Sequence, residues 1–132
     1  MTTIADDHGL VLRVLMGVVA ADLLDADEGR ASLQACYTRL TGRPLDAAAV
    51  GTGRAHAVDH PGAWLDAARQ LARALEPEAR DRVLASAFEI ACADGFVLEE
   101  EDRVLATLAA ALGMSDAEYR HSIERLLAAA QA

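Results

Sequence analysis

Residues 93–101 read Ala-Asp-Gly-Phe-Val-Leu-Glu-Glu-Glu, and they separate one apolar helical pattern from the next. Gly95 can adopt the positive φ that reverses the chain, and Val97 or Phe96 can place a side chain in the core. Asp94 can cap or bridge the turn. The glutamates open the following helix, where a negative charge is favoured by about 0.3–1 kcal/mol at exposed sites. The segment therefore predicts a junction between two helices that needs no ligand to form.

A second segment of the chain has the same pattern. Residues 21–28, Ala-Asp-Leu-Leu-Asp-Ala-Asp-Glu, align with residues 93–100, and both segments stand between apolar helical patterns. The alignment continues into the following helix at two pairs of leucines, Leu33 with Leu105 and Leu40 with Leu112. We interpret the chain as two helix–junction–helix units that are related by an internal pseudo-twofold repeat.

The rest of the sequence also favours helices. The chain has 132 residues and a mass of 13.9 kDa, which fits one domain over residues 1–132, and its abundant Ala and Leu are strong helix formers. Residues 54–60, between glycines and a proline, are expected to form a loop. Short connections predict neighbouring antiparallel helices, and thus an all-α fold, a compact bundle of about seven helices. The expected helices are residues 9–24, 28–40, a short segment from 46 that fades at 51–53, and then 61–75, 77–91, 99–112 and 115–127.

The last two helices carry the clearest boundary signals. Gly113 stands where a C′ glycine ends a helix. Ser115 is the expected N-cap of the final helix, and Glu118 completes a capping box three residues later. The apolar spacing then predicts an inner stripe on this helix, formed by Tyr119, Ile123, Leu126 and Leu127.

Trp64, in the expected helix that opens at residue 61, has helical spacing with its leucine and alanine neighbours and is expected in the core.

Charge and composition exclude several classes of protein. Acidic residues number 21 and basic residues 12, so the formal net charge is −9. This balance argues against a nucleic-acid binder and against a polybasic membrane-surface module. The apolar runs are too short to span a bilayer and no signal peptide is evident, so a soluble cytoplasmic protein is expected. Cys36 and Cys92 lie in apolar helical patterns and are expected to be buried thiols without a disulfide.

The second junction resembles a known family signature. The pattern helix–Ala-Asp-Gly-x-Val-x-x-x-Glu–helix is similar to that of the TerB (tellurite resistance) family, and it is carried by Ala93, Asp94, Gly95, Val97 and Glu101. The resemblance covers most of residues 8–130. It implies a compact, non-enzymatic helical domain of bacterial stress systems that handle tellurite or other envelope insults. It also implies metal-binding acidic residues at the junction, and partners that include calcium-binding and membrane-integral proteins. The first junction lacks the glycine and the last glutamate of the pattern, because Leu23 and Gly29 stand at those positions.

The acidic junctions allow three interpretations. Residues 94–101 match the second half of a calcium-binding EF-hand loop, but Ile90 and Cys92 occupy the positions of its first two carboxylates, which argues against a self-contained loop site. A site assembled across both junctions is the second interpretation, and its oxygen ligands would select calcium, magnesium or manganese over zinc. The third is a pair of solvated helix caps without metal. The candidate ligands are Asp22, Asp25, Asp27, Glu28, Asp94, Glu100 and Glu101.

Two further patterns are weaker candidates for metal sites. Glu118 and His121 have the Glu-x-x-His spacing of di-iron bundles, but no second copy exists and the capping box explains the glutamate. His56 and His60 are four residues apart, yet the surrounding glycines and proline predict an irregular segment, so they are interpreted as surface histidines. No nucleophile or phosphate-loop motif is present, so an enzyme is not expected.

The sequence thus predicts a non-enzymatic TerB-like stress-response domain that acts by binding. Asp94 and Glu101 are the first-choice ligands for a divalent cation, with Asp22 and Glu28 opposite them, or the same acidic face docks a basic protein surface. The alternative is a metal-free interaction or assembly module. In that case a groove between alanine-rich helices accepts a partner helix, or the chain forms a homodimer. Neither nucleic-acid binding nor direct membrane insertion is expected.

Overall fold

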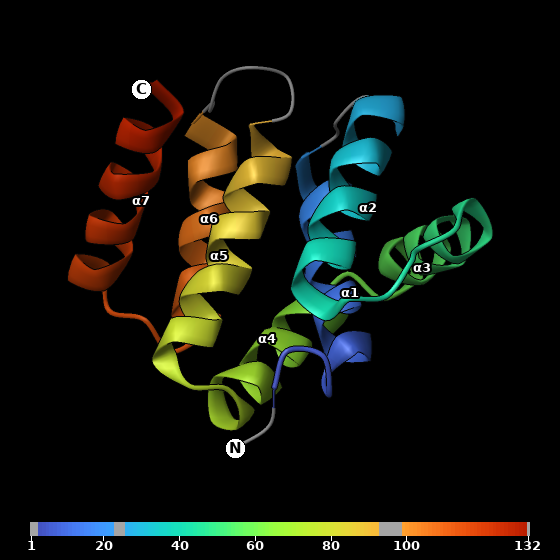
Figure 1. The fold of residues 1–132 in the computed structure, drawn as a ribbon, viewed down its shortest axis with the longest axis horizontal. Helices are drawn as coiled ribbons and strands as arrows, with labels where there is room; N and C mark the ends of the chain where they lie inside the picture. Colours follow the sequence, from blue (N-terminus) through green and yellow to red (C-terminus); the bar gives the residue numbers. More distant parts are fainter. Residues whose placement is uncertain (1–2, 23–25, 93–98, 132) are drawn as a thin grey trace.

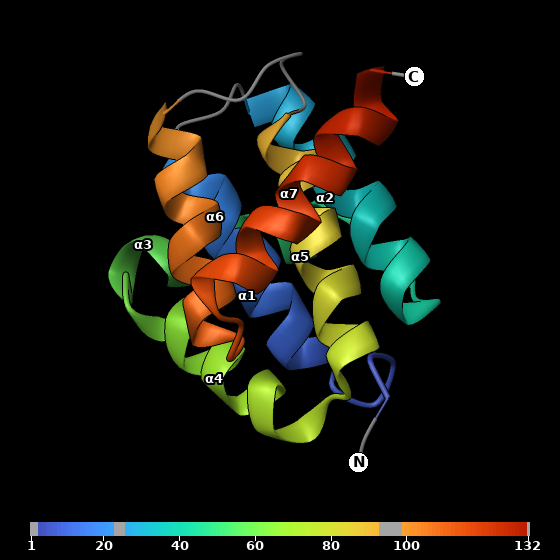
Figure 2. The ribbon, with the colours of Figure 1, turned by 90° about the vertical axis from the view of Figure 1, so that its left-hand side faces the viewer.

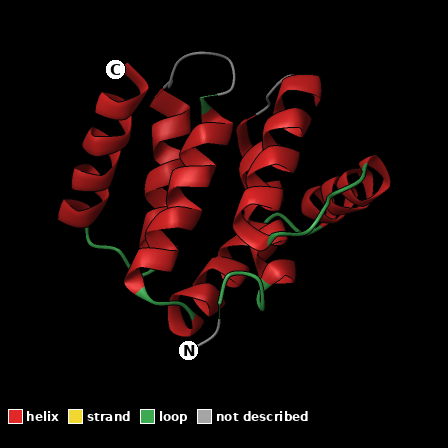
Figure 3. Ribbon diagram, viewed as in Figure 1, coloured by secondary structure: helices red, strands yellow, loops and turns green. Residues whose placement is uncertain are grey.

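A computed structural model describes residues 3–22, 26–92 and 99–131, which form helices without any strand (Figures 1 and 3). This confirms the predicted all-α class. None of the helices in these ranges combines the length and the apolar character that a membrane crossing requires. The helices are α1 (His8–Asp22), α2 (Ala26–Thr41), α3 (Ala47–Asp59), α4 (Ala63–Ala74), α5 (Pro77–Ala91), α6 (Glu99–Ala111) and α7 (Asp116–Gln131).

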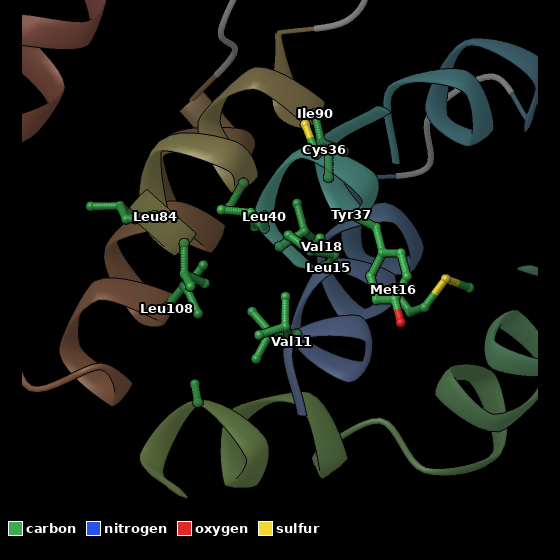
Figure 4. Packing of buried hydrophobic residues seen from close by; sticks show 14 of the residues in the cluster. Val11, Leu15, Met16, Val18, Cys36, Tyr37, Leu40, Leu84, Ile90 and Leu108 are labelled. Atoms are coloured by element: carbon green, nitrogen blue, oxygen red, sulfur yellow. The ribbon is translucent and has the colours of Figure 1, made fainter. Parts of the chain in front are cut away.

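Helix α1 lies at the centre of the bundle, because it packs against α2, α3, α4, α5 and α6. Its apolar face is fully buried at Val11, Val14, Leu15 and Val18. Figure 4 shows residues of this face directed toward side chains from α2, α5 and α6. Burial of each such side chain stabilises the fold by about 1.5–3 kcal/mol, so α1 is the principal source of core contacts.

Helices α1 and α4 approach each other at a glycine. Gly17 is buried in α1, and a Cβ atom at this position would lie 2.2 Å from both Cβ and Cγ of Trp64. The indole therefore occupies the space that any larger residue at position 17 would need. Trp64 itself is half-buried and packs against the core, as the sequence predicted.

The connection from α6 to α7 confirms the predicted boundary signals. Gly113 has a φ of 83°, and the amides of Gly113 and Met114 donate to the carbonyls of Ala110 and Ala109 at 3.0 and 2.9 Å, which is a Schellman motif. The Ser115 amide donates to Glu118 Oε1, and the Glu118 amide donates to Ser115 Oγ, each at 3.1 Å. This reciprocal pair is the predicted capping box.

Helix α7 is attached to α5 and α6 largely by polar contacts. The Ser122 hydroxyl donates to Asp81 Oδ1 at 2.8 Å, and Arg125 forms an ion pair with the other oxygen of the same carboxylate. Leu127 was predicted to face inward, but 37% of its surface is exposed. This prediction is wrong because α7 packs at the edge of the bundle on α5 and α6 only through a narrower apolar stripe.

The predicted loop at residues 54–60 is also wrong, since α3 extends through it to Asp59. Two features compensate for the glycines in this helix. Asp46 caps the helix by accepting a hydrogen bond from the Ala49 amide at 2.7 Å. Gly53 lies against the Met16 side chain, which would be 3.1 Å from a Cβ atom at residue 53. The helix thus gains a close contact with α1 that local sequence patterns do not reveal.

The two predicted helix–junction–helix units correspond to the α1–α2 and α5–α6 hairpins. The leucines that align between the two sequences, Leu33, Leu40, Leu105 and Leu112, are all buried. The pseudo-twofold relation between the hairpins stays a prediction.

Candidate functional site

The helix ends that flank the two acidic junctions lie at the same end of the molecule. The C-terminal ends of α1 and α5 and the N-terminal ends of α2 and α6 are at the top of Figure 1, and the rotated view of Figure 2 agrees. The two hairpins are side by side because α5 packs against both α1 and α2. The described helix ends that flank the two acidic segments therefore lie at one end of the bundle.

The predicted ligands stand at these helix ends in the chain. Asp22 is the last residue of α1, Asp27 and Glu28 are in the first turn of α2, and Glu100 and Glu101 are in the first turn of α6. The side chains of these five residues, together with Asp25 and Asp94 as a whole, lie outside the described part of the structure. Their convergence on one ion stays a prediction.

The backbone contributes to the electrostatics of this end of the molecule. The C-terminal ends of α1 and α5 present carbonyl groups and a partial negative charge, which favour a cation. The N-terminal ends of α2 and α6 carry partial positive charge, which favours the acidic residues of their first turns. Such carboxylates are therefore stabilised by their own helices whether or not a metal binds.

Asp102, next to the glutamate run, is already engaged by α7. The Tyr119 hydroxyl donates to Asp102 Oδ1 at 2.7 Å and to the Asp102 carbonyl oxygen at 3.2 Å. Burial of the phenol and the adjacent carboxylate raise the pKa of Tyr119. The pair ties α7 to the first turn of α6. Apart from the apolar spacing of Tyr119, no sequence pattern predicted this contact.

Side chains elsewhere in the described ranges form no cluster of three or more His, Cys, Asp or Glu that could hold a metal ion. The hydrogen bonds between Ser115 and Glu118 confirm the capping interpretation of the Glu-x-x-His spacing. They also lower the pKa of the Glu118 carboxyl group. His56 and His60 are exposed, as predicted. His56, however, is in the last turn of α3 and not in an irregular segment, and His60 is the C-cap residue that follows the helix.

A polar cluster that sequence reasoning missed joins α2 to α5. Arg39 forms an ion pair with Glu89, and its Nη2 donates to Cys36 Sγ at 3.4 Å. The Cys36 thiol approaches Glu89 Oε2 at 3.5 Å. The Arg39 and Cys36 side chains are three residues apart on one helix, but their partner comes from a distant part of the chain.

Cys36 is a structural thiol, and no disulfide joins it to Cys92. Only 1% of Cys36 is exposed, as predicted, whereas Cys92 is half-buried. Burial and the charge of Glu89 raise the pKa of Cys36 to about 11. Since the thiolate is the nucleophile, this cysteine is unsuited to nucleophilic chemistry at neutral pH.

We expect Cys36 in the Cys92→Ser variant to react with an aromatic disulfide reagent at pH 8 about 100-fold more slowly than in the same variant unfolded in urea. The difference follows from its raised pKa and its burial. Absorbance of the released thiolate measures both rates. Equal rates in the two states would contradict the assignment of Cys36 as a buried, protonated thiol.

A groove of about 780 Å³ runs beside this cluster. Its apolar wall includes Leu40, Phe88 and Leu126, and Arg82 and Glu89 supply charge. The groove thus lies between α2, α5 and α7. The sequence-based alternative of a groove that accepts a partner helix did not specify its helices, and it stays a prediction.

One comparison with known proteins gives a match. The model of the family described as tellurite resistance protein TerB matches residues 7–122. No curated protein and no solved structure matches the chain. The matched region runs from the residue before α1 into α7, and it includes both acidic junctions.

Proposed function

Since the chain belongs to the family of tellurite resistance protein TerB, we propose that it is a non-enzymatic, cytoplasmic stress-response domain that binds a divalent cation at its acidic helix junctions. The observation that carries the proposal is the common position of the four helix ends that lead into those junctions. Carboxylates on two neighbouring hairpins are suited to a cation that bridges them. Oxygen donors of this kind select calcium, magnesium or manganese.

The proposed ligands divide between the two hairpins. Asp94 and Glu101 come from the α5–α6 junction, and Asp22 and Glu28 come from the α1–α2 junction. Asp25, Asp27 and Glu100 complete the set of candidates. A cation held from both sides would offset the repulsion among these carboxylates, which is largest when all of them are ionised. It would therefore stabilise the contact between the two hairpins.

We expect millimolar calcium or manganese to raise the melting temperature of the protein by several degrees, because an ion that binds only the folded state stabilises it by mass action. Asp94→Asn should abolish the rise. The melting curves are measured by circular dichroism, with and without a chelator.

Asp116→Asn is the matched control, because Asp116 is exposed in the first turn of α7, which begins at the opposite end of the bundle (Figure 1). The control should keep the full response to the ion. If no divalent ion changes the melting temperature of the natural sequence, the metal-dependent version of the proposal is wrong.

The groove between α2, α5 and α7 favours a second candidate function, a metal-free interaction module. Its open apolar wall could accept an amphipathic helix from a stress-system protein or from a second copy of the chain. Size-exclusion chromatography with light scattering distinguishes self-association from a monomer. A protein that stays monomeric and does not respond to divalent ions would leave docking of a different protein as the remaining version.

A further inference from the structure

Two imidazoles lie close together at the C-terminal end of α3, where His56 is in the last turn and His60 is the C-cap residue. His56 and His60 are four residues apart, and their ring centroids are separated by 4.6 Å with an angle of 36° between the rings. The His60 amide donates to the His56 carbonyl at 2.9 Å, so the helical turn that joins them is intact. Both side chains are exposed, and a ligand can therefore reach them from solvent.

The spacing of four residues is similar to that of a two-histidine chelate on a helix. The backbone of His60 has left the helical conformation, with φ of −130° and ψ of 71°, so the closeness of the two rings rests on their observed separation. Metal–nitrogen bonds to histidine are about 2.0–2.1 Å, so two nitrogens on one ion lie at most about 4.2 Å apart. Rings whose centroids are 4.6 Å apart can reach this arrangement by side-chain rotation. The end of α3 thus brings two nitrogen donors close together, and rotation of the exposed side chains completes the chelate.

The surroundings of the pair define which ion would bind. The two histidines line a cavity of about 460 Å³ between α1, α3 and α4. Met16 and Trp64 form part of its wall, and Figure 4 shows the Met16 side chain directed toward α3. Among the described residues that line this cavity, none is a carboxylate. The donors are therefore imidazoles, which suit copper, nickel and zinc and not calcium or magnesium.

We propose that His56 and His60 chelate a late first-row transition-metal ion, with Cu²⁺ bound most tightly, at the mouth of the α1–α3–α4 cavity. Copper stands highest in the affinity order for divalent ions at nitrogen sites. Water completes the coordination, because two side chains supply only two ligands. The site is independent of the acidic junctions in position, ligand type and metal preference.

The test is titration of the full chain with CuSO₄ in a buffer that does not bind copper. We expect binding of one ion, a rise in melting temperature on the order of 5 °C, and an electron paramagnetic resonance spectrum with hyperfine splitting from two imidazole nitrogens. The melting temperature rises because the folded helix holds both rings together, whereas the unfolded chain must order them. His56→Ala and His60→Ala should each weaken binding by about tenfold or more.

His121→Ala is the matched control, since His121 is exposed on α7 and does not line this cavity. It should leave copper binding unchanged. Copper binding that persists at the same affinity in the His56→Ala/His60→Ala double variant would overturn the proposal. Absence of two-nitrogen splitting in the natural sequence would overturn it as well.

Discussion

Gly17→Ala will lower the free energy of unfolding by about 3 kcal/mol, in the upper part of the range for overpacked cores. The added methyl group would lie 2.2 Å from Cβ and Cγ of Trp64. These atoms are next to the α4 backbone, so rotation of the indole cannot relieve the overlap, and α1 and α4 must move apart. Urea denaturation followed by circular dichroism measures the loss.

Gly9→Ala provides the control within the same helix. A Cβ atom at residue 9 has no neighbour within 4 Å, so this variant gains helix propensity without a clash. We expect a stability that is unchanged or raised by up to about 1 kcal/mol. Equal stability of the two variants would contradict the close packing of α1 against α4 at residue 17.

Leu15→Ala will lower the free energy of unfolding by about 2–5 kcal/mol, as large-to-small changes in buried cores do. Leu15 is fully buried on the central helix, among side chains from other helices (Figure 4). The surrounding helices are held by several neighbours each and cannot fully collapse into the space. The same denaturation experiment measures the change.

Leu127→Ala removes the same group from an exposed position on α7, where 37% of the leucine is accessible. Surface substitutions of this kind change stability by about 0.5 kcal/mol or less. The comparison separates loss of core packing from loss of the side chain itself. A large effect at Leu127 would show that this residue is buried in a contact with another molecule.

Local signals in the sequence predicted local structure well. Gly113, Ser115 and Glu118 fix the connection between α6 and α7 through hydrogen bonds among residues a few positions apart. Pro77 in the first turn of α5 is also a local signal, because its ring fixes the backbone angle φ at a value suited to the start of a helix. Because these interactions involve near neighbours, the chain order alone contains the information that specifies them.

Contacts between residues far apart in the sequence explain why the structure differs from some of the sequence-based predictions. Helix α3, which includes residues 54–59, lies against Met16 of α1 at Gly53. The ion pair of Arg39 with Glu89 joins residues fifty positions apart. The candidate metal site at the acidic junctions also depends on contacts between distant segments. Its acidic residues could be identified from the sequence, and so could their place at helix ends. Whether their oxygen atoms meet depends on how the two hairpins pack.

The central position of α1 has a mechanical consequence. This helix contacts five others, so it cannot slide or rotate without disturbing nearly every layer around it. One of its ends leads into the first acidic junction. A displacement of α1 at that end would therefore change its packing against all five neighbouring helices at once.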